Sequence, residues 1–351
     1  MMSLSMVTGN YAAFPYVVPK SLDECLSGLE HFIYYPNPGN LGDELIAAST
    51  VTLFDRIGLS YEVYEEGRDY GEAYTLVYGG GGGLVSEWDW HEVMAPVFSS
   101  PGLSRCVILP HSIRGCRSIL QLMDERFTVF CREHRSLEYC RKFNQKASFL
   151  PADDMAFYLS PLLLPSWESL VERCAEPGIL LRLFSGMNLI KEREAHLCRF
   201  YRKTCRRLLR HLSSRVQLLE DGRRVGWFLR EDQERDEAFA SCLPPVPRMD
   251  VSRYGGGDCR WHDYNMMGVY MLLHAVNAVD VVVTDRLHVS IAAAMAGRET
   301  MMIDNSYGKL SGVYEQSMKP LSHVSFCRNM EELLLQLRRS NVPVPNHERR
   351  D

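Results

Sequence analysis

The sequence predicts an α/β fold in which helices cover both faces of parallel sheets. Short runs of β-branched and aromatic residues alternate along the chain with helix-like segments, which is the pattern of strand–helix–strand units. Most polar and charged residues that could carry chemistry come directly after one of these runs. Because the carboxyl ends of parallel strands meet at one edge of a sheet, this placement predicts a ligand site at that edge.

The first half of the chain contains most of the predicted strands. The run at 31–35 is followed by a turn at 36–43 and by a helix that begins at Glu44. The run at 74–78 leads directly into five consecutive glycines at 79–83. The same alternation predicts further strands at 59–63, 106–110, 127–131 and 147–150.

A proline-containing stretch at 159–165 is typical of a linker, so we expect one domain over 1–165 and a second over 166–351. The polar segment 221–260 has no clear assignment, and we expect the charged C-terminal tail to be disordered. The second domain is expected to hold strands at 178–183, 215–219, 279–283 and 300–304, a long helix around 195–212 and a leucine-rich helix at 330–337.

The composition is that of an ordinary soluble protein, with 46% hydrophobic and 24% charged residues. A formal net charge of -5 argues against a general nucleic-acid binder. The 11 cysteines form no CxxC pair and no metal-ligand spacing, which favours reduced thiols in a cytoplasmic protein without a metal site. The N-terminus lacks the order of a signal peptide, and no apolar run approaches the roughly 18 residues of a membrane-spanning helix.

Basic residues cluster at 199–210, where leucine and phenylalanine interleave with arginine at helical spacing. Two interpretations are open. The segment is either an amphipathic surface helix or a patch for an anionic membrane or an acidic carrier lipid. The second interpretation places the protein peripherally at the inner face of a membrane.

The segment 279–295 is the most informative part of the chain. A run of β-branched residues, typical of a buried strand, passes into an alanine-rich helical segment. Asp285, Arg286, Leu287 and His288 lie at the junction, where a permanent cation and an imidazole meet a helix N-terminus. Such a junction suits a phosphate or a carboxylate. The alternative is an aspartate that caps the helix beside an arginine in a structural ion pair.

Two glycine-containing turns are expected to line the same cleft. The turn at Asn40, Gly42 and Asp43 lets backbone N–H groups approach a ligand closely, although such residues also form ordinary turns. The glycine run, with Gly80, Gly81 and Gly82 at its centre, indicates that the backbone passes very close to a ligand or to the facing domain. Its spacing matches neither the dinucleotide fingerprint nor the P-loop.

Further candidates follow other strands. His111 is expected at the end of the strand 106–110, where an imidazole could be structural or catalytic. Arg132, expected at the rim of the cleft, offers a bidentate fork for an anion, and Glu133 could orient it or act as a base. Arg182 and Lys309 could add positive charge.

Together these motifs resemble the polysaccharide pyruvyltransferase family over roughly residues 30 to 315. Two positions depart from the family pattern: Val289 stands where a glycine is common, and Asp154 where a proline is usual. The motifs, in order, are Asn40-Leu41-Gly42-Asp43, the glycine run, Leu109-Pro110-His111-Ser112-Ile113, Arg132-Glu133 followed by Ser136, Ala152-Asp153, Thr284-Asp285-Arg286-Leu287-His288, and Asp304 with Gly308-Lys309.

The resemblance implies two Rossmann-like domains that face each other across a cleft, as in the GT-B glycosyltransferases. It implies phosphoenolpyruvate as the donor, with no cofactor, and a sugar diol as the acceptor. The acceptor would be a polysaccharide precursor, expected to be a lipid-linked oligosaccharide. The product would be a cyclic pyruvate ketal, made during exopolysaccharide biosynthesis with release of phosphate.

The residue chemistry agrees with this implication. Phosphoenolpyruvate carries a carboxylate and a phosphate, so its site needs several cations, which Arg132, Arg286 and Lys309 would supply. Ketal formation protonates one carbon and deprotonates two hydroxyls, and either His288 or His111 could transfer protons near neutral pH. Two alternatives stay open: a GT-B glycosyltransferase that uses a nucleotide sugar, and a non-catalytic member of the family.

Overall fold

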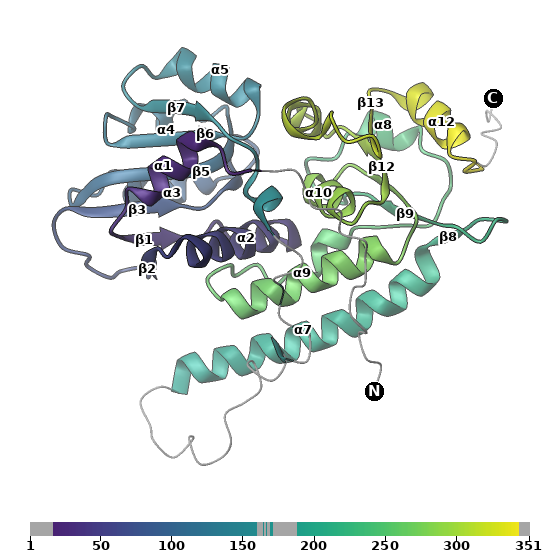
Figure 1. Cartoon of the computed structure of the whole chain (residues 1–351), viewed down its shortest axis with the longest axis horizontal. Helices are drawn as coiled ribbons and strands as arrows, with labels where there is room; N and C mark the ends of the chain where they lie inside the picture. Colours follow the sequence, from purple (N-terminus) through teal and green to yellow (C-terminus); the bar gives the residue numbers. More distant parts are fainter. Residues whose placement is uncertain (1–16, 160–163, 165, 167–168, 171–187, 344–351) are drawn as a thin grey trace.

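The computed structural model describes residues 17–159, 164, 166, 169–170 and 188–343, which form two sheets with helices packed against them (Figure 1). The first sheet has the strand order β2-β1-β3-β5-β6-β7, and β4 pairs with β5; all of these pairings are parallel. Its strands are β1 (His31–Tyr35), β2 (Ser60–Val63), β3 (Tyr74–Tyr78), β4 (Gly81–Val85), β5 (Leu103–Arg114), β6 (Phe127–Cys131) and β7 (Ser148–Pro151).

The second sheet has the order β10-β9-β11-β12-β13, all parallel, and β8 pairs with β9 in the antiparallel direction. These two sheets confirm the predicted α/β class. The strands of the second sheet are β8 (Gln217–Leu218), β9 (Arg224–Phe228), β10 (Arg248–Met249), β11 (Val281–Thr284), β12 (Glu299–Ile303) and β13 (Val324–Cys327).

One hydrophobic core joins the two sheets, because buried residues of both, such as Val77 in β3 and Val282 in β11, belong to the same cluster. Helix α2 (Leu41–Ile57) packs against α9 (His262–Asn277) and α10 (Leu287–Met295) within it. Helix α7 (Asn188–Arg215) lies along α9 at the bottom of the view in Figure 1.

Separate clusters cover the two outer faces. The helices on the first are α3 (Trp90–Phe98), α4 (Arg117–Gln121) and α5 (His134–Phe143), and those on the second are α8 (Glu237–Ser241) and α12 (Met330–Arg339). The other helices are α1 (Lys20–Ser27) and α11 (Lys309–Val313), with single turns η1 (Met155–Tyr158), η4 (Val251–Tyr254) and η5 (Tyr314–Met318).

Three predicted boundaries are wrong in and around the first sheet, one of a helix and two of strands. Helix α2 begins at Leu41 rather than Glu44, because Asn40 and Asp43 form a capping box at its N-terminus. The glycine run is not only a loop, since β4 begins at Gly81. Strand β5 continues past Pro110 to Arg114, so His111 lies within the strand and not after it.

In the second half, β11, β12 and α12 form where strands and a helix were predicted, whereas β9, β10, β13 and α9 were not predicted. Helix α7 extends to Arg215, which reduces the strand predicted at 215–219 to Gln217–Leu218. The predicted strand 178–183, Arg182 and the tail from 344 lie outside the described residues. Nine cysteines whose side chains are described are free thiols, and no helix among the described residues is long and apolar enough to cross a membrane.

Candidate active site

A pocket of about 320 Å³ lies between the two sheets. Loops at the carboxyl ends of strands from both sheets form its walls, which is where the sequence predicted the site. The predicted residues in its lining are Asn40, Asp43, Gly82, Arg286, Leu287, His288 and Lys309.

Two cations from opposite sheets approach Gly82, which lines the pocket: Lys309 lines the pocket as well, whereas Arg132 is fully buried and is not among the lining residues. A Cβ atom on Gly82 would lie 3.0 Å from Arg132 Nη2 and 3.0 Å from Lys309 Nζ, so a larger residue would displace one of them. This close approach is the reason for glycine at the centre of the run. The backbone also passes close to the second half of the molecule here, as the sequence predicted.

Arg132 is fully buried and does not lie at the rim of the cleft, where we expected it. Its Nη1 donates to Asp154 Oδ2 over 2.6 Å and its Nε donates to the Ser112 hydroxyl over 2.9 Å. Its Nη2 has no hydrogen-bond partner among the described residues. A buried donor without a partner costs free energy, so Nη2 is free to donate to a further acceptor atom.

Lys309 is the second cation beside Gly82. Burial lowers the pKa of its ammonium group to about 8, although Glu234, with its Oε2 3.8 Å from Nζ, acts in the opposite direction. Lys309 is therefore mostly charged at neutral pH and loses its charge in mildly alkaline solution.

His288 lies at the start of α10, with its Nε2 3.4 Å from Asp154 Oδ2. Burial acts to raise the pKa of Asp154, but the charges of Arg132 and His288 hold it below its usual range. One ionised carboxylate therefore links Arg132 to the imidazole. The Nδ1 side of the ring faces Gly42, where a Cβ atom would lie 2.1 Å from Nδ1, so the turn of Asn40–Asp43 leaves room for the imidazole.

Arg286 lines the pocket, but its guanidinium already binds two carboxylates. Its Nη1 lies 2.7 Å from Asp232 Oδ2 and its Nε donates to Asp250 Oδ1 over 3.1 Å. The structure thus shows the structural ion pairs of the alternative interpretation, but no side chain caps the start of α10 as that interpretation expected of the aspartate.

His111 does not line the pocket. It is fully buried inside β5, where its Nε2 accepts from the Leu84 backbone N–H over 3.3 Å and its Nδ1 lies 3.2 Å from the Gly79 carbonyl oxygen. Burial and the charge of Arg132 lower the pKa of its imidazole to about 3, so the ring is neutral at physiological pH. In this position His111 holds the two ends of the glycine run.

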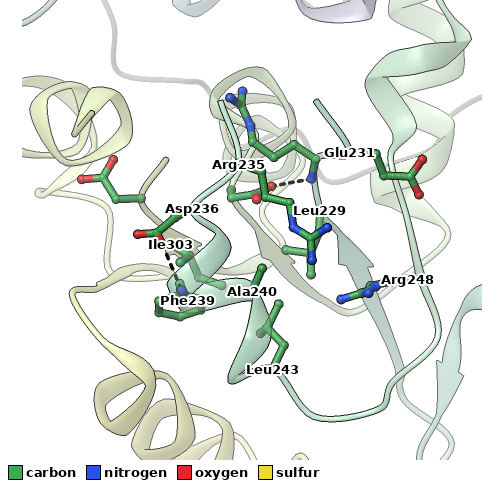
Figure 2. A pocket seen from close by; sticks show the side chains of 12 residues that line it. Leu229, Glu231, Arg235, Asp236, Phe239, Ala240, Leu243, Arg248 and Ile303 are labelled. Carbon is green, nitrogen blue, oxygen red and sulfur yellow. Dashed lines mark hydrogen bonds between the residues drawn. The ribbon is translucent and has the colours of Figure 1, made fainter. Parts of the chain in front are cut away.

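Five other residues that were expected to line the cleft also lie outside the pocket lining, namely Gly42, Gly80, Gly81, Glu133 and Asp285. Asp285 faces a separate pocket of about 210 Å³ between the ends of β9 and β12 and helix α8, drawn in Figure 2. It accepts from the Arg230 backbone N–H over 2.7 Å, and burial raises its pKa to about 6. Glu133 caps α5 by accepting from the Ser136 backbone N–H over 2.6 Å.

One side of the pocket is lined by two tryptophans and a valine, which the sequence analysis missed and which we call the aromatic wall. Trp88, Trp90 and Val93 follow β4, and Trp88 Nε1 donates to Glu234 Oε1 of the second half over 2.8 Å. Trp88 is 37% exposed and Val93 47%, so an apolar surface faces the solvent at the mouth. Two tryptophans two positions apart after a glycine run are a signal that could have found it.

The acidic residues of the site were also missed. Asp154 comes three residues after the end of β7, so its position after a predicted strand was visible in the sequence. Asp232, Glu234 and Asp250 come from the segment 221–260, which had no assignment. The run Arg224–Phe228 ahead of them could have been interpreted as a strand with polar residues at its carboxyl end.

Comparison with known proteins bears on the family and on the fold of the chain. The sequence model described as polysaccharide pyruvyl transferase matches residues 40–307, which include every predicted site residue except Lys309. The fold is similar to the crystal structure of an uncharacterized protein from Klebsiella pneumoniae subsp. pneumoniae NTUH-K2044, with a TM-score of 0.61 and 23% sequence identity over 88% of this chain and 96% of that chain. No curated protein matches the sequence.

Proposed function

Because this chain belongs to the polysaccharide pyruvyl transferase family, we propose that it transfers the pyruvyl group of phosphoenolpyruvate to two hydroxyls of a saccharide, as a cyclic ketal. The observation that carries the proposal is the approach of Arg132 Nη2 and Lys309 Nζ to Gly82. A buried guanidinium N–H without a partner, next to an ammonium group, suits a ligand with several negative charges.

The donor site combines these cations with the start of α10. Phosphoenolpyruvate carries a phosphate and a carboxylate, so it can satisfy Arg132 and Lys309 together. The backbone N–H groups at Leu287 and His288 begin a helix, whose N-terminus favours negative charge. In this proposal Arg286 holds Asp232 and Asp250 in place, and its own contact with the donor is secondary.

The proton chemistry is assigned to His288. The imidazole gives a proton to C3 of the donor, and C2 becomes electrophilic. Two acceptor hydroxyls then form bonds to C2 while its bond to the phosphate oxygen breaks. One hydroxyl proton restores the imidazole and the other leaves with the phosphate, so the reaction balances. Asp154 serves as a positioning residue that orients the imidazole, at 3.4 Å from its Nε2.

His111 is not assigned to proton transfer in this proposal. Both of its ring nitrogens are used by the backbone at Gly79 and Leu84, and its lowered pKa keeps the ring neutral, so that its one N–H is held by the Gly79 carbonyl at neutral pH. Its role is to hold the glycine run against β5, which keeps Gly82 beside the two cations.

The acceptor lies against the aromatic wall in this proposal. Trp88 and Trp90 offer flat apolar surfaces for a sugar ring, and Asp89 and Asp232 offer carboxylates for its hydroxyls. A saccharide carried on a lipid would present its sugar at this open mouth, with the enzyme acting in the cytoplasm. We also propose that the two sheets form GT-B-like domains, 1–165 and 166–351, each with its own outer core.

The test is phosphate release from phosphoenolpyruvate across a panel of free and lipid-linked saccharides, with calorimetry of donor binding in parallel. We expect phosphoenolpyruvate to bind and at least one saccharide to trigger stoichiometric phosphate release. Binding of a nucleoside diphosphate without binding of phosphoenolpyruvate would instead support a glycosyltransferase. Tight binding of phosphoenolpyruvate without turnover on any acceptor would support a non-catalytic member of the family.

A further inference from the structure

The exposed side of the 199–215 part of α7 carries positive charge without any acidic residue. Between 199 and 215 the helix contains no aspartate or glutamate, and its side chains at Tyr201, Cys205, Leu208 and Leu212 are buried against the protein. The opposite side, which we call the basic face, consists of the exposed residues Arg202, Lys203, Arg206, Arg207, Arg210 and Arg215.

Basic residues elsewhere on the surface pair with carboxylates. Lys20 in α1 pairs with Glu24 over 3.4 Å, and Arg328, which precedes α12, has its Nη2 2.5 Å from Oε1 of Glu332 in that helix. On the basic face, Arg202 and Arg210 each stand one turn from Arg206, and like charges at that spacing destabilise a helix. Among the described residues, no carboxylate lies within ion-pair distance of any residue of the basic face.

A groove of about 360 Å³ runs beside the basic face, between α7 and η4. Arg207, His211 and Arg215 form one wall, and Arg253 lies on the other. The two carboxylates in the groove are already bound, since Glu231 pairs with Arg253 and Asp250 with Arg286. The groove therefore adds a recess with excess positive charge beside the basic face.

We propose that the basic face and this groove dock the protein onto an anionic membrane, by contact with the phosphates of its lipids. The proposal goes beyond the transfer reaction and does not depend on it. A flat surface fits this face because the apolar side of α7 is fully used by the protein, so the helix cannot enter a nucleic-acid groove on its own. The exposed positions also hold no aromatic residue on which a base could stack.

The test is co-sedimentation of the full chain with vesicles of phosphatidylcholine alone or mixed with phosphatidylglycerol. We expect binding only to the anionic vesicles, weakened by salt. Each cation near such a surface strengthens binding by about 5-fold, so Arg202→Gln/Arg206→Gln/Arg210→Gln should weaken it by about 100-fold. The matched control is Lys146→Gln/Arg338→Gln/Arg339→Gln, which removes the same charge from exposed positions elsewhere and should bind like the unmodified chain.

Circular dichroism checks that both triple variants fold. If one variant does not fold, the salt dependence of vesicle binding by the unmodified chain still tests whether the binding is electrostatic. Equal binding to neutral and anionic vesicles, or equal loss in both triple variants, would overturn the proposal. So would tighter binding to duplex DNA than to the anionic vesicles at the same salt concentration. Calorimetry with phosphoenolpyruvate is measured separately, so loss of the donor site and loss of membrane binding are distinguishable.

Discussion

At the scale of single residues, Arg132 illustrates how one side chain serves both stability and the proposed chemistry. Its Nη1 and Nε hold Asp154 and Ser112, and its Nη2, which has no partner among the described residues, is the atom that our proposal assigns to the donor. The sequence placed this arginine after a strand, which is right, but gave no sign that it would be fully buried. Its carboxylate partner comes from a different strand end, and such a pairing becomes visible only in three dimensions.

Arg132→Ala should therefore destabilise the protein as well as remove donor binding. The substitution leaves Asp154 buried and ionised without its main partner, a change that typically costs about 3–5 kcal/mol. Denaturant unfolding measures that loss directly. Stability within about 0.5 kcal/mol of the unmodified protein, which is typical of surface substitutions, would mean that the ion pair does not hold the site together.

His288→Gln should retain most of the affinity for phosphoenolpyruvate but lower turnover by about 10²–10⁴-fold, because glutamine can form hydrogen bonds but cannot transfer a proton. His111→Gln is the comparison. It should cost less turnover than His288→Gln, since the His111 imidazole only binds backbone groups. Steady-state rates of phosphate release decide this, and a larger loss in His111→Gln would reverse the assignment.

The affinity for phosphoenolpyruvate should fall as the pH rises through about 8, where Lys309 loses its charge. The sign follows from its lowered pKa: below that pH the ammonium group is charged and attracts the donor, and above it the group is neutral. Calorimetry across pH 6 to 9.5 measures the effect. Lys309→Met should bind more weakly and lack this step, and an unchanged step in the variant would show that another group titrates.

At the scale of elements, the predictions succeed where a local pattern decides the structure. The strands β1, β3 and β6 and helix α10 follow from runs of apolar residues at strand or helix spacing. Strand β5 was cut short because Pro110 is unusual inside a strand. Strand β4 was missed because three of its five residues are glycines. In the folded chain β5 pairs with β3, β4 and β6, and this pairing overrides the low strand tendency of proline and glycine. No local sequence pattern contains such pairing.

The same limit applies to the site. The motif loops were predicted because they combine unusual residue types at strand ends, whereas Asp232, Glu234 and Asp250 belong to a segment with no clear period. Their importance comes from the cations that they contact in space, Arg230, Arg286 and Lys309.

The glycine composition of β4 gives a test at this scale. Gly82→Ala places a methyl group 3.0 Å from both Arg132 Nη2 and Lys309 Nζ, so one cation must move and donor affinity should fall about 10-fold or more. Gly28→Ala is the control, because a Cβ atom there lies no closer than 3.3 Å to other atoms, away from the pocket. If calorimetry finds equal donor affinity in both variants, the close approach at Gly82 has no role in binding.

At the scale of the whole molecule, the two sheets are joined more firmly than a cleft between separate domains would suggest. Helices α2 and α9 share one core, and the Glu44 carboxylate on α2 accepts from the Tyr201 hydroxyl on α7 over 2.6 Å. We therefore expect a single cooperative thermal unfolding transition, shifted upward by phosphoenolpyruvate. Calorimetric scans that resolve two transitions, with only one shifted by the donor, would show that the halves fold and bind independently.

The central claim is that a donor anion completes the buried network of Arg132, Asp154, His288 and Lys309. A crystal structure with phosphoenolpyruvate tests it most directly. We expect an oxygen of the donor within hydrogen-bond distance of both Arg132 Nη2 and Lys309 Nζ, with His288 facing the donor. Phosphoenolpyruvate bound elsewhere, for example in the pocket beside Asp285 in Figure 2, with Arg132 Nη2 still unpartnered, would contradict the account.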